Sequence, residues 1–400
     1  MTIEGNPFII YRHRLRSYLR WIDGGGTDLG FVDLVEELDS AVAEVDGHGF
    51  TVTPVTEQPG LAAAAGLPRR SRLWVKDETS NVSGSHKARH LFGLALHMAV
   101  SERLGDRAGG DGSEPTELAI ASCGNAALAA AVIARAVDRP LRVFIPTWAD
   151  APVVESLERL EARVQVCERR QGESGDPCYR RFRESVASGA VPFSVQGTDA
   201  PETLDGGRTI GWELADQLAD LQGAPARLDT VTVQVGGGAL GASLAMGLRD
   251  GVEEGRLLAM PSVHPVQTEA VHPLERAFNL LVEEGRRTGL SGSSLMDVAR
   301  SDPDRFMWPW EDMGVSIASG ILDDVTYDWL PLVEATMESG GHPVTVGEEL
   351  VERAWRLGRE KTGIDVSATG TAGLAGLMEL APTLPDDVFA AVLFTGSQRD

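Results

Sequence analysis

Short apolar runs alternate with helical patterns along most of the chain, and this alternation constrains the fold more than any other feature. Runs rich in Val, Leu and Ile end in Gly, Ser or Asn and are followed by stretches whose apolar residues recur at helical spacing. Strands separated by helices in this way pair in parallel, because each helix carries the chain back to the edge where the strands begin. The sequence therefore predicts an α/β protein with largely parallel sheets.

The predicted elements follow one another from residue 31 to the C-terminus. We expect strands over 72–77, 117–122, 141–146, 164–167, 229–235 and 388–394, and helices over 31–45, 87–104, 124–137, 153–160 and 177–188. Residues 105–115 are polar and Gly-rich and are expected to form a surface loop. Residues 287–328 look irregular, so we expect either a lid near the site or a surface loop packed down by its tryptophans.

Length and composition favour a small-molecule enzyme. At 400 residues and 42% hydrophobic content, the chain can form a large core, as either two domains or one large α/β unit. A net charge of −23 repels nucleic acid backbones and acidic lipid surfaces. Three scattered cysteines fit neither a disulfide framework nor a zinc site, and no apolar run of about 18 residues predicts a membrane span. We expect a cytoplasmic protein that binds small molecules and no metal, membrane or nucleic acid.

The chain has three lysines, Lys76, Lys87 and Lys361, so chemistry that needs an amine nucleophile must use one of them. Lys87 ends the segment Asn81-Val-Ser-Gly-Ser-His-Lys, which follows a predicted strand and begins a predicted helix. The positive end of the helix dipole and shielding from water would lower the pKa of an amine there and favour imine formation. Taken alone, a lysine at a helix start is most often a solvated surface group, but three further segments change that interpretation.

Three turns at the ends of predicted strands fit an anionic cofactor and an amino acid. Ala121-Ser-Cys-Gly-Asn125 offers backbone N–H groups that suit a carboxylate, although the pattern is equally typical of a simple helix cap. Val235-Gly-Gly-Gly-Ala-Leu-Gly241 lets backbone amides approach a phosphate, and its spacing differs from the G-x-G-x-x-G of dinucleotide-binding turns. Thr395 follows the last predicted strand, where its hydroxyl either faces a pyridine nitrogen or merely ends the strand.

In this order, the four segments resemble the fold type II family of pyridoxal-phosphate enzymes, and most of all its threonine synthase and threonine dehydratase members. Over residues 50–400, Thr53-Pro-Val is similar to the family's Thr-Pro-Leu, and Lys76-Asp-Glu is similar to its Lys-x-Glu. The resemblance implies two domains, each a mostly parallel twisted sheet flanked by helices, with the cofactor in the cleft between them. It places residues 1–85 and 206–400 in a large domain, with an extension over 1–50, and residues 86–205 in a small one.

The resemblance also implies roles for particular residues. Lys87 would hold pyridoxal phosphate as a Schiff base and act as general acid and base. Asn125 would contact the 3-hydroxyl of the cofactor, Thr395 its ring nitrogen, and the glycine turn its phosphate; the remaining cofactor contacts would be His86, Gly236, Gly237, Gly238, Ala239 and Leu240. The substrate would contact Ser85, Ser122, Cys123 and Gly124. A neutral hydroxyl at the ring nitrogen favours loss of a β-substituent over transamination.

Four positions depart from the family pattern. His86 stands where the dehydratase and threonine synthase members usually have Phe, and Ala88 replaces the Asp of many threonine synthases. Ala126 stands where many relatives have Thr or His. Ser367 stands where relatives often have a carboxylate. These departures limit what the resemblance implies about the substrate.

The resemblance implies a lyase or synthase that removes the α-proton of a small amino acid. Elimination of the β-substituent would give a 2-oxo acid and ammonia, and capture by a second small nucleophile would give a new amino acid. The alternatives are γ-replacement on an O-phosphohomoserine-like substrate, a catalytically silent paralogue that binds the cofactor, and a nucleotide-binding oxidoreductase. The last lacks the expected acidic partner residue. The habit of the family implies a homodimer.

Overall fold

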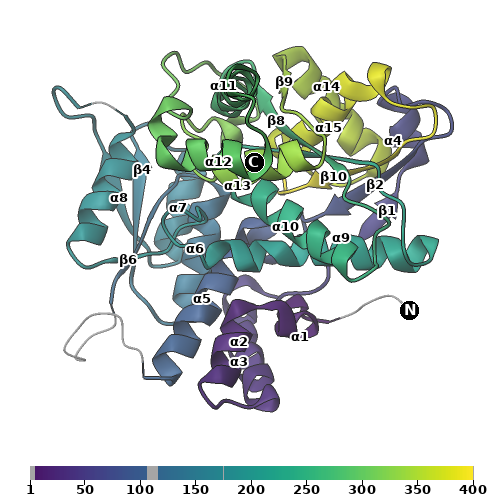
Figure 1. The fold of residues 1–400 in the computed structure, drawn as a ribbon. Helices are drawn as coiled ribbons and strands as arrows, with labels where there is room; N and C mark the ends of the chain where they lie inside the picture. Colours follow the sequence, from purple (N-terminus) through teal and green to yellow (C-terminus); the bar gives the residue numbers. More distant parts are fainter. Residues whose placement is uncertain (1–4, 106–115, 174, 400) are drawn as a thin grey trace. The chain divides into compact units, whose positions relative to one another are not determined.

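The computed structural model describes residues 5–105, 116–173 and 175–399, and the chain divides into two compact units. The large unit comprises Thr53–Ser80 and Ile210–Asp400, and the small unit comprises Glu4–Val52 and Asn81–Thr209. Each unit contains one sheet, and most of the strand pairs are parallel (Figure 1). The prediction of an α/β protein with parallel sheets flanked by helices is therefore confirmed.

The sheet of the large unit has the strand order β1-β2-β10-β7-β8-β9, in which β1 and β2 are antiparallel and the other neighbours are parallel. Its strands are β1 (Val55–Glu57), β2 (Arg72–Asp77), β7 (Thr230–Gln234), β8 (Ser262–Thr268), β9 (Val344–Val346) and β10 (Phe389–Phe394). Its helices are α4 (Pro59–Ala64), α10 (Ala239–Glu253), α11 (Pro273–Thr288), α12 (Gly292–Ser301), α13 (Trp329–Glu338), α14 (Glu348–Thr362) and α15 (Ala368–Leu380). Helix α9 (Thr203–Gln222) begins in residues of the small unit and ends in residues of the large unit.

The central strands of this sheet are buried on both faces, which explains why they read as continuous apolar runs. In β10, Ala390 and Val392 pack in one core with α15, whereas Ala391 and Leu393 pack in a second core with α10 and α13 (Figure 1). Because β7 and β10 are parallel neighbours, their carboxyl ends lie at the same edge of the sheet. The segments that follow these two strands are therefore close together.

The sheet of the small unit has the order β5-β4-β3-β6, and all its strand pairs are parallel. Its strands are β3 (Leu118–Ala121), β4 (Leu141–Pro146), β5 (Arg163–Cys167) and β6 (Val191–Pro192). Its helices are α1 (Pro7–Ile10), α2 (Arg16–Asp23), α3 (Asp28–Asp46), α5 (Lys87–Arg103), α6 (Asn125–Ala136), α7 (Ala151–Arg159) and α8 (Pro177–Ala187). Helix α8 covers one face of this sheet, and α6 with α7 covers the other (Figure 1).

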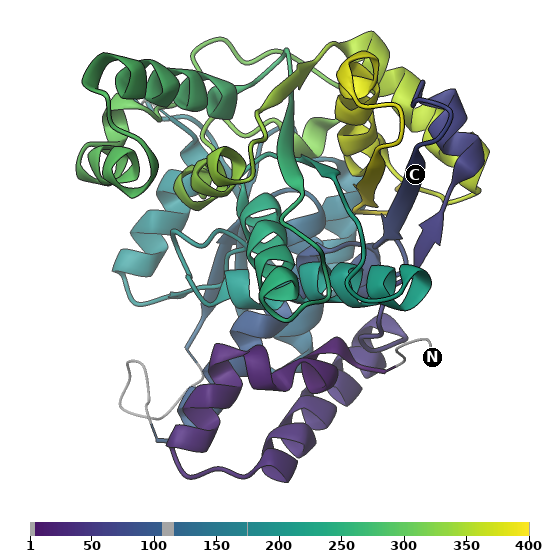
Figure 2. The same cartoon turned by 45° about the vertical axis from the view of Figure 1, so that its right-hand side comes forward.

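The N-terminal helices α1 to α3 group with the small unit, whereas the family resemblance placed residues 1–50 with the large domain. These helices group with the small unit because they contact it through aromatic rings and through helix–helix packing. Phe8 contacts Phe50 and Phe92, with ring centroids 5.3 and 4.7 Å away, and α2 packs on α5 while α3 packs on α6 (Figure 2). The first 50 residues thus add a helical layer beside the helix that begins at Lys87.

Residues 287–328 contain more regular structure than the sequence indicated. Helix α12 lies within this segment. Packing stabilises the helix, since its residues Leu295, Met296 and Ala299 are buried in the core of the large unit. The guanidinium of Arg276 on α11 stacks on two tryptophans of this segment, 3.8 and 4.9 Å from their ring centroids. Around Trp308 and Trp310 this stacking fits the second expectation, a surface loop packed down by its tryptophans. Asp323 and Thr326, later in the segment, lie instead beside the predicted glycine turn.

Three other expectations concern the surface and metal binding. Of the predicted loop over 105–115, residues 106–115 lie outside the described residues. In the described ranges, no helix is both long enough and apolar enough to cross a membrane. The same ranges contain no group of three His, Cys, Asp or Glu side chains placed to hold a metal ion.

Candidate active site

Lys87 is the first residue of α5 and follows a tight turn built from small residues. The turn contains the 3-10 segment Val82–Gly84, in which Ser83 has a φ of 54°. Non-glycine residues seldom adopt this left-handed conformation, and such strain is typical of backbone held in place for a function. The Ser83 N–H donates to Asp46 Oδ2 at 2.9 Å, which supports the turn. Lys87 itself is half-buried, and the three residues after it are buried.

Two histidines flank Lys87 on α5. The rings of His86 and His90 contact each other, with centroids 5.9 Å apart. His90 is fully buried, and its Nδ1–H donates to the carbonyl oxygen of Thr203 at 3.0 Å. Burial, and after it the positive charge of Lys87, lowers the pKa of His90 to about 3. A neutral imidazole therefore lies one helical turn from the lysine at physiological pH.

Lys76 is fully buried in the large unit, and its ammonium group is engaged in hydrogen bonds. Its Nζ donates to the carbonyl oxygen of Thr53 at 2.7 Å, to Glu213 Oε2 at 2.5 Å and to Gln217 Oε1 at 3.0 Å. An ammonium group has three N–H donors, so this set satisfies all of them. Lys76 is thus a poor candidate for a reactive amine.

The two short motifs that resemble the family pattern belong to the same buried network. Thr53 donates through its hydroxyl to Glu78 and through its N–H to Glu213 at 3.1 Å, and both glutamates are fully buried. Their role in this chain is therefore structural. The third lysine, Lys361, is at the surface with its Nζ 2.6 Å from Glu360 Oε1. Of the three amines, Lys87 has the position that best fits a chemical role.

The turn Ser122–Gly124 joins β3 to α6 and is the predicted carboxylate site. Gly124 caps α6 without a side-chain hydrogen bond, so the first N–H groups of this helix can face an anion. Ser122, Cys123 and Asn125 are half-buried. Lys87 is the first residue of α5 and Asn125 is the first residue of α6. These two helices pack against one another in the small unit.

Ser85 is also a predicted substrate contact, and it is fully buried two residues before Lys87. Within the described part of the chain, its Oγ has no hydrogen-bond partner. Burying a hydroxyl without a partner is costly, and native proteins usually satisfy such a group with a ligand or water. This observation fits a ligand that brings a polar group to the start of α5.

The glycine turn Gly236–Gly238 joins β7 to α10 in the large unit. Gly238 has a φ of 97° and caps α10 without a side-chain hydrogen bond. A Cβ at this position would lie 2.9 Å from Thr326 Cγ2, and a Cβ at Gly236 would lie 2.5 Å from Asp323 Oδ2. The positive φ at Gly238 favours glycine there, and a side chain at Gly236 would have to displace the Asp323 carboxylate. The backbone N–H groups at the start of α10, including those of Ala239 and Leu240, suit a phosphate.

Thr395 follows β10, and Gln234 at the end of the neighbouring β7 holds its hydroxyl. Gln234 Nε2 donates to Thr395 Oγ1 and to the carbonyl oxygen of Gly370, at 2.7 Å each, and both side chains are buried. Because the hydroxyl oxygen of Thr395 accepts this hydrogen bond, the hydroxyl would meet a ring nitrogen as a donor. This geometry fits an unprotonated pyridine nitrogen.

Ser367, which stands where relatives often have a carboxylate, caps α15. Its Oγ accepts a hydrogen bond from the N–H of Gly370 at 3.0 Å. The carbonyl oxygen of Gly370 in turn accepts from the N–H of Thr395 at 3.3 Å. The substitution at Ser367 therefore removes a charge from this loop but keeps the loop that supports Thr395.

The predicted site residues fall into two groups. The small unit contains Ser85, His86, Lys87, Ser122, Cys123, Gly124 and Asn125, and the large unit contains Gly236, Gly237, Gly238, Ala239, Leu240 and Thr395. The first group offers an amine and an anion-binding turn. The second offers a glycine turn for a phosphate and a hydroxyl for a pyridine nitrogen. The residues present therefore fit pyridoxal phosphate.

Sequence reasoning missed two residues of the large unit. Gln234 is a polar residue at the end of an otherwise apolar stretch, immediately before the glycine turn, and this contrast was the available signal. Asp323, beside Gly236, forms an acidic pair with Asp324, which the sequence indicated only as a possible cation ligand that lacks EF-hand spacing. Its position becomes visible only in the folded chain.

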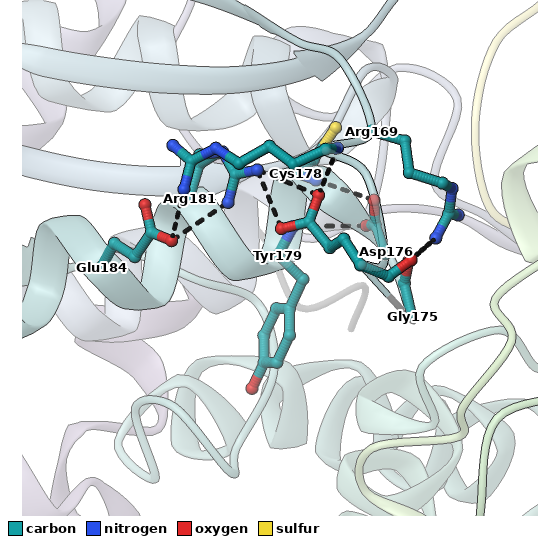
Figure 3. Close-up of polar contacts among 9 residues, drawn as sticks. Arg169, Gly175, Asp176, Cys178, Tyr179, Arg181 and Glu184 are labelled. Carbon is teal, nitrogen blue, oxygen red and sulfur yellow. Dashed lines mark hydrogen bonds and ion pairs between the residues drawn. The ribbon is translucent and has the colours of Figure 1, made fainter.

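A separate surface cavity of about 500 Å³ lies in the small unit, and none of the predicted site residues line it. Three arginines contribute to its wall, but glutamates neutralise them. Arg181 lies beside Glu184 in Figure 3, with 3.0 Å between Nη1 and Oε1, and Arg142 Nη2 is 2.9 Å from Glu117 Oε2. This pairing weakens the cavity as an anion site.

Comparison with known proteins agrees with this chemistry. The family described as "Pyridoxal-phosphate dependent enzyme" matches residues 48–396. The chain is 29% identical to the serine dehydratase-like protein of Mus musculus over 267 residues, which is 66% of this chain and 69% of that protein. It is 27% identical to the L-serine dehydratase/L-threonine deaminase of Bos taurus over 198 residues, 50% of this chain and 53% of that protein.

Solved structures show the same fold. The threonine deaminase of T.th. superposes with a TM-score of 0.64 at 22% identity, covering 91% of this chain and 98% of that one. Maize serine racemase superposes with a TM-score of 0.63 at 18% identity, covering 92% and 94%. Because the family match extends over most of the sequence, the chain belongs to the pyridoxal-phosphate dependent enzymes of fold type II, and pyridoxal phosphate is its cofactor.

Proposed function

We propose that the protein is a lyase that eliminates the β-hydroxyl of a small amino acid such as serine or threonine. The observation that carries this proposal is the similarity to the mouse and bovine proteins, which are named as a serine dehydratase-like protein and a serine dehydratase/threonine deaminase. The Ser122–Gly124 turn and the neutral hydroxyl of Thr395 support the same chemistry. The cytoplasmic location expected from the composition and the homodimer implied by the resemblance remain part of the proposal.

The residues that would hold the cofactor come from both units. Lys87 would bind it through Nζ, and the glycine turn with the start of α10 would bind its phosphate through backbone N–H groups. When bound, pyridoxal phosphate withdraws electrons from the substrate α-carbon and stabilises the charge left by the departing α-proton. The hydroxyl of Thr395 would donate to the ring nitrogen and keep it unprotonated, which favours loss of a β-substituent over transamination.

The chain's own residues would bind the substrate and move its protons. The N–H groups at the start of α6 would bind the carboxylate, and the Ser85 hydroxyl would offer a further hydrogen bond. Lys87 Nζ would take the α-proton and then return a proton to the departing hydroxyl, which leaves as water. The neutral His90 adds no positive charge beside this amine. The enamine that is released would tautomerise to an imine and take up a water molecule, which gives a 2-oxo acid and ammonia.

The near-visible spectrum of the purified protein with pyridoxal phosphate tests this assignment. The wild-type protein and the control variant Lys361→Ala should show the absorbance band of cofactor bound to an amine, and Lys87→Ala should lack it. L-serine or L-threonine should yield a 2-oxo acid and ammonia. A wild-type protein that takes up no cofactor would contradict the proposal.

The same preparation separates the rival functions. O-acetylserine with a second nucleophile tests β-replacement, and O-phosphohomoserine tests γ-replacement. A band that responds to none of these amino acids would instead indicate a catalytically silent paralogue.

A further inference from the structure

We propose that Asp46 is a positioning residue, which holds the turn before Lys87 in the shape that presents the Lys87 amine for its reaction. This inference rests on the proposed function, because Lys87 is the amine that the function requires. Asp46 is the last residue of α3 and precedes residues 48–396, which match the family. Asp46, the turn and Lys87 all belong to the small unit.

The turn over residues 81–86 contains a backbone conformation that its own sequence does not favour. Ser83 has a φ of 54°, and this left-handed region is disfavoured for a residue with a side chain. The N–H of Gly84 donates to the carbonyl oxygen of Asn81 at 2.7 Å, which closes the turn. Lys87 begins α5 only four residues after Ser83. Contacts that offset the strain at Ser83 therefore also fix where the lysine begins its helix.

Asp46 makes one such contact. Its Oδ2 accepts the N–H of Ser83 at 2.9 Å, and Ser83 is buried. A hydrogen bond to a carboxylate is stronger than one between neutral groups, so it can offset the backbone strain. Helix α3 contacts the turn and also packs on α6, so the carboxylate reaches Ser83 from a helix that is anchored in the same unit.

The position of Asp46 is unfavourable for α3 itself. The carboxyl end of a helix has a partial negative charge, which repels a carboxylate in the last turn. Residues 43–46 of α3 include no basic residue. His48 Nε2 is 3.5 Å from Asp46 Oδ2, but this side chain is 51% exposed and is charged only when protonated. A residue that opposes the local preference of its helix is typical of a functional position, and the contact with Ser83 gives Asp46 a role outside α3.

Chemical labelling of Lys87 in protein freed of cofactor tests this inference. When the amine adds to the aldehyde of pyridoxal phosphate, a water molecule leaves, and reduction with borohydride makes the new bond permanent. Mass spectrometry then gives the rate at which Lys87 is modified, with the surface residue Lys361 as the internal reference. Asp46→Ala should slow the modification of Lys87 about tenfold, because the turn loses a charge-assisted hydrogen bond.

Two control variants separate the hydrogen bond from a general effect on α3. Asp46→Asn keeps an oxygen that can accept the N–H of Ser83, so it should restore most of the rate. Asp39→Ala removes a similar hydrogen bond seven residues earlier on the same helix, where Asp39 Oδ1 accepts the N–H of Phe50 at 2.7 Å. This variant should leave the reaction of Lys87 unchanged.

Hydrogen exchange supplies a second readout, which needs neither cofactor nor turnover. The N–H of Ser83 should exchange about tenfold faster in Asp46→Ala than in the wild type, and at the wild-type rate in Asp39→Ala. A double variant that combines Asp46→Ala with Ser83→Gly should recover part of the Lys87 rate, because glycine adopts the left-handed conformation without strain.

The outcomes separate this inference from the proposed function. If Lys87 reacts equally fast in the wild type and in Asp46→Ala, the inference is wrong and the proposed function stands. The same follows if Asp39→Ala slows the reaction equally, because the packing of the N-terminal helices would then be the cause, or if Asp46→Asn does so. A wild-type protein whose Lys87 reacts no faster than Lys361 overturns the proposed function, and exchange of the Ser83 N–H still reports whether Asp46 holds the turn.

Discussion

Lys76 and Lys87 are eleven residues apart in the sequence, but their surroundings differ in charge and in burial. Lys76 is fully buried, with its Nζ hydrogen-bonded to Glu213 and two uncharged oxygens. Lys87 is half-buried at a helix start, one turn from the neutral His90. Carboxylates hold an amine in its charged form, whereas a helix N-terminus and a neutral imidazole do not. Lys76 is therefore part of a buried structural network, and the position of Lys87 supports the chemical role that we propose for it.

The largest expected effect is the loss of stability when Lys76, the lysine with the structural role, is replaced. Lys76→Met should lower the free energy of unfolding by about 3–5 kcal/mol, because the buried carboxylate of Glu213 loses its counter-ion. Urea denaturation of protein freed of cofactor measures the change without a contribution from binding. The near-visible band of any folded Lys76→Met protein should persist after cofactor is added.

The exposed Lys361 supplies the control for this experiment. Lys361→Met should change neither the stability nor the band. If Lys76→Met were as stable as the wild type, or if it lost the band while folded, the division of roles between the two lysines would be wrong.

A second substitution, in the same large unit as Lys76, tests whether the glycine turn binds the cofactor. Gly236→Ala should weaken binding of pyridoxal phosphate by an amount equivalent to about 1–3 kcal/mol, since the added methyl group displaces either Asp323 or the backbone of Ile321. Equilibrium dialysis measures this affinity. Gly60→Ala is the control, because a Cβ at Gly60 meets no atom within 4 Å. Equal affinities in both variants would remove the glycine turn from the site.

The smallest expected effect concerns the pH dependence of stability. The pKa of His90 falls from an ordinary 6.5 to about 3 in the folded protein, so the unfolded chain binds a proton over this range that the folded chain does not. The stability due to neutral His90 is complete above pH 6.5 and is lost progressively as the pH falls toward 3. Between pH 6.5 and about 5.5, His90 should account for a loss of about 1 kcal/mol.

Denaturation curves at several pH values measure this slope. His90→Phe should flatten it. Burial also lowers the pKa of His264, to about 4, so His264→Phe should flatten the slope over a narrower range. An unaltered slope in His90→Phe would show that the imidazole beside Lys87 is not held neutral by the fold.

Much of the fold follows from residues that are close together in the sequence. The strands over 72–77 and 141–146 and the helix start at Lys87 were predicted at the positions that the structure shows, because apolar periodicity and Gly, Ser and Asn turns act locally. Helix α12 was missed, since residues 289–294 are mostly Gly and Ser, which are typical of turns, and the buried face of the helix begins only after them. The first 50 residues showed a helix but gave no sign of the unit it would join.

The sequence by itself determined the α/β class, through the alternation of apolar runs and helical patterns, and the cofactor, through short motifs in a particular order. The same motifs predict Lys87 as the reactive amine. Tertiary structure alone decided that Lys76 is part of a buried ion network, that Gln234 holds Thr395, and that Asp323 lies against Gly236. The physical reason is that these contacts join residues far apart in the chain. Only the packing of strands and helices brings such residues within hydrogen-bond distance, and no local pattern records it.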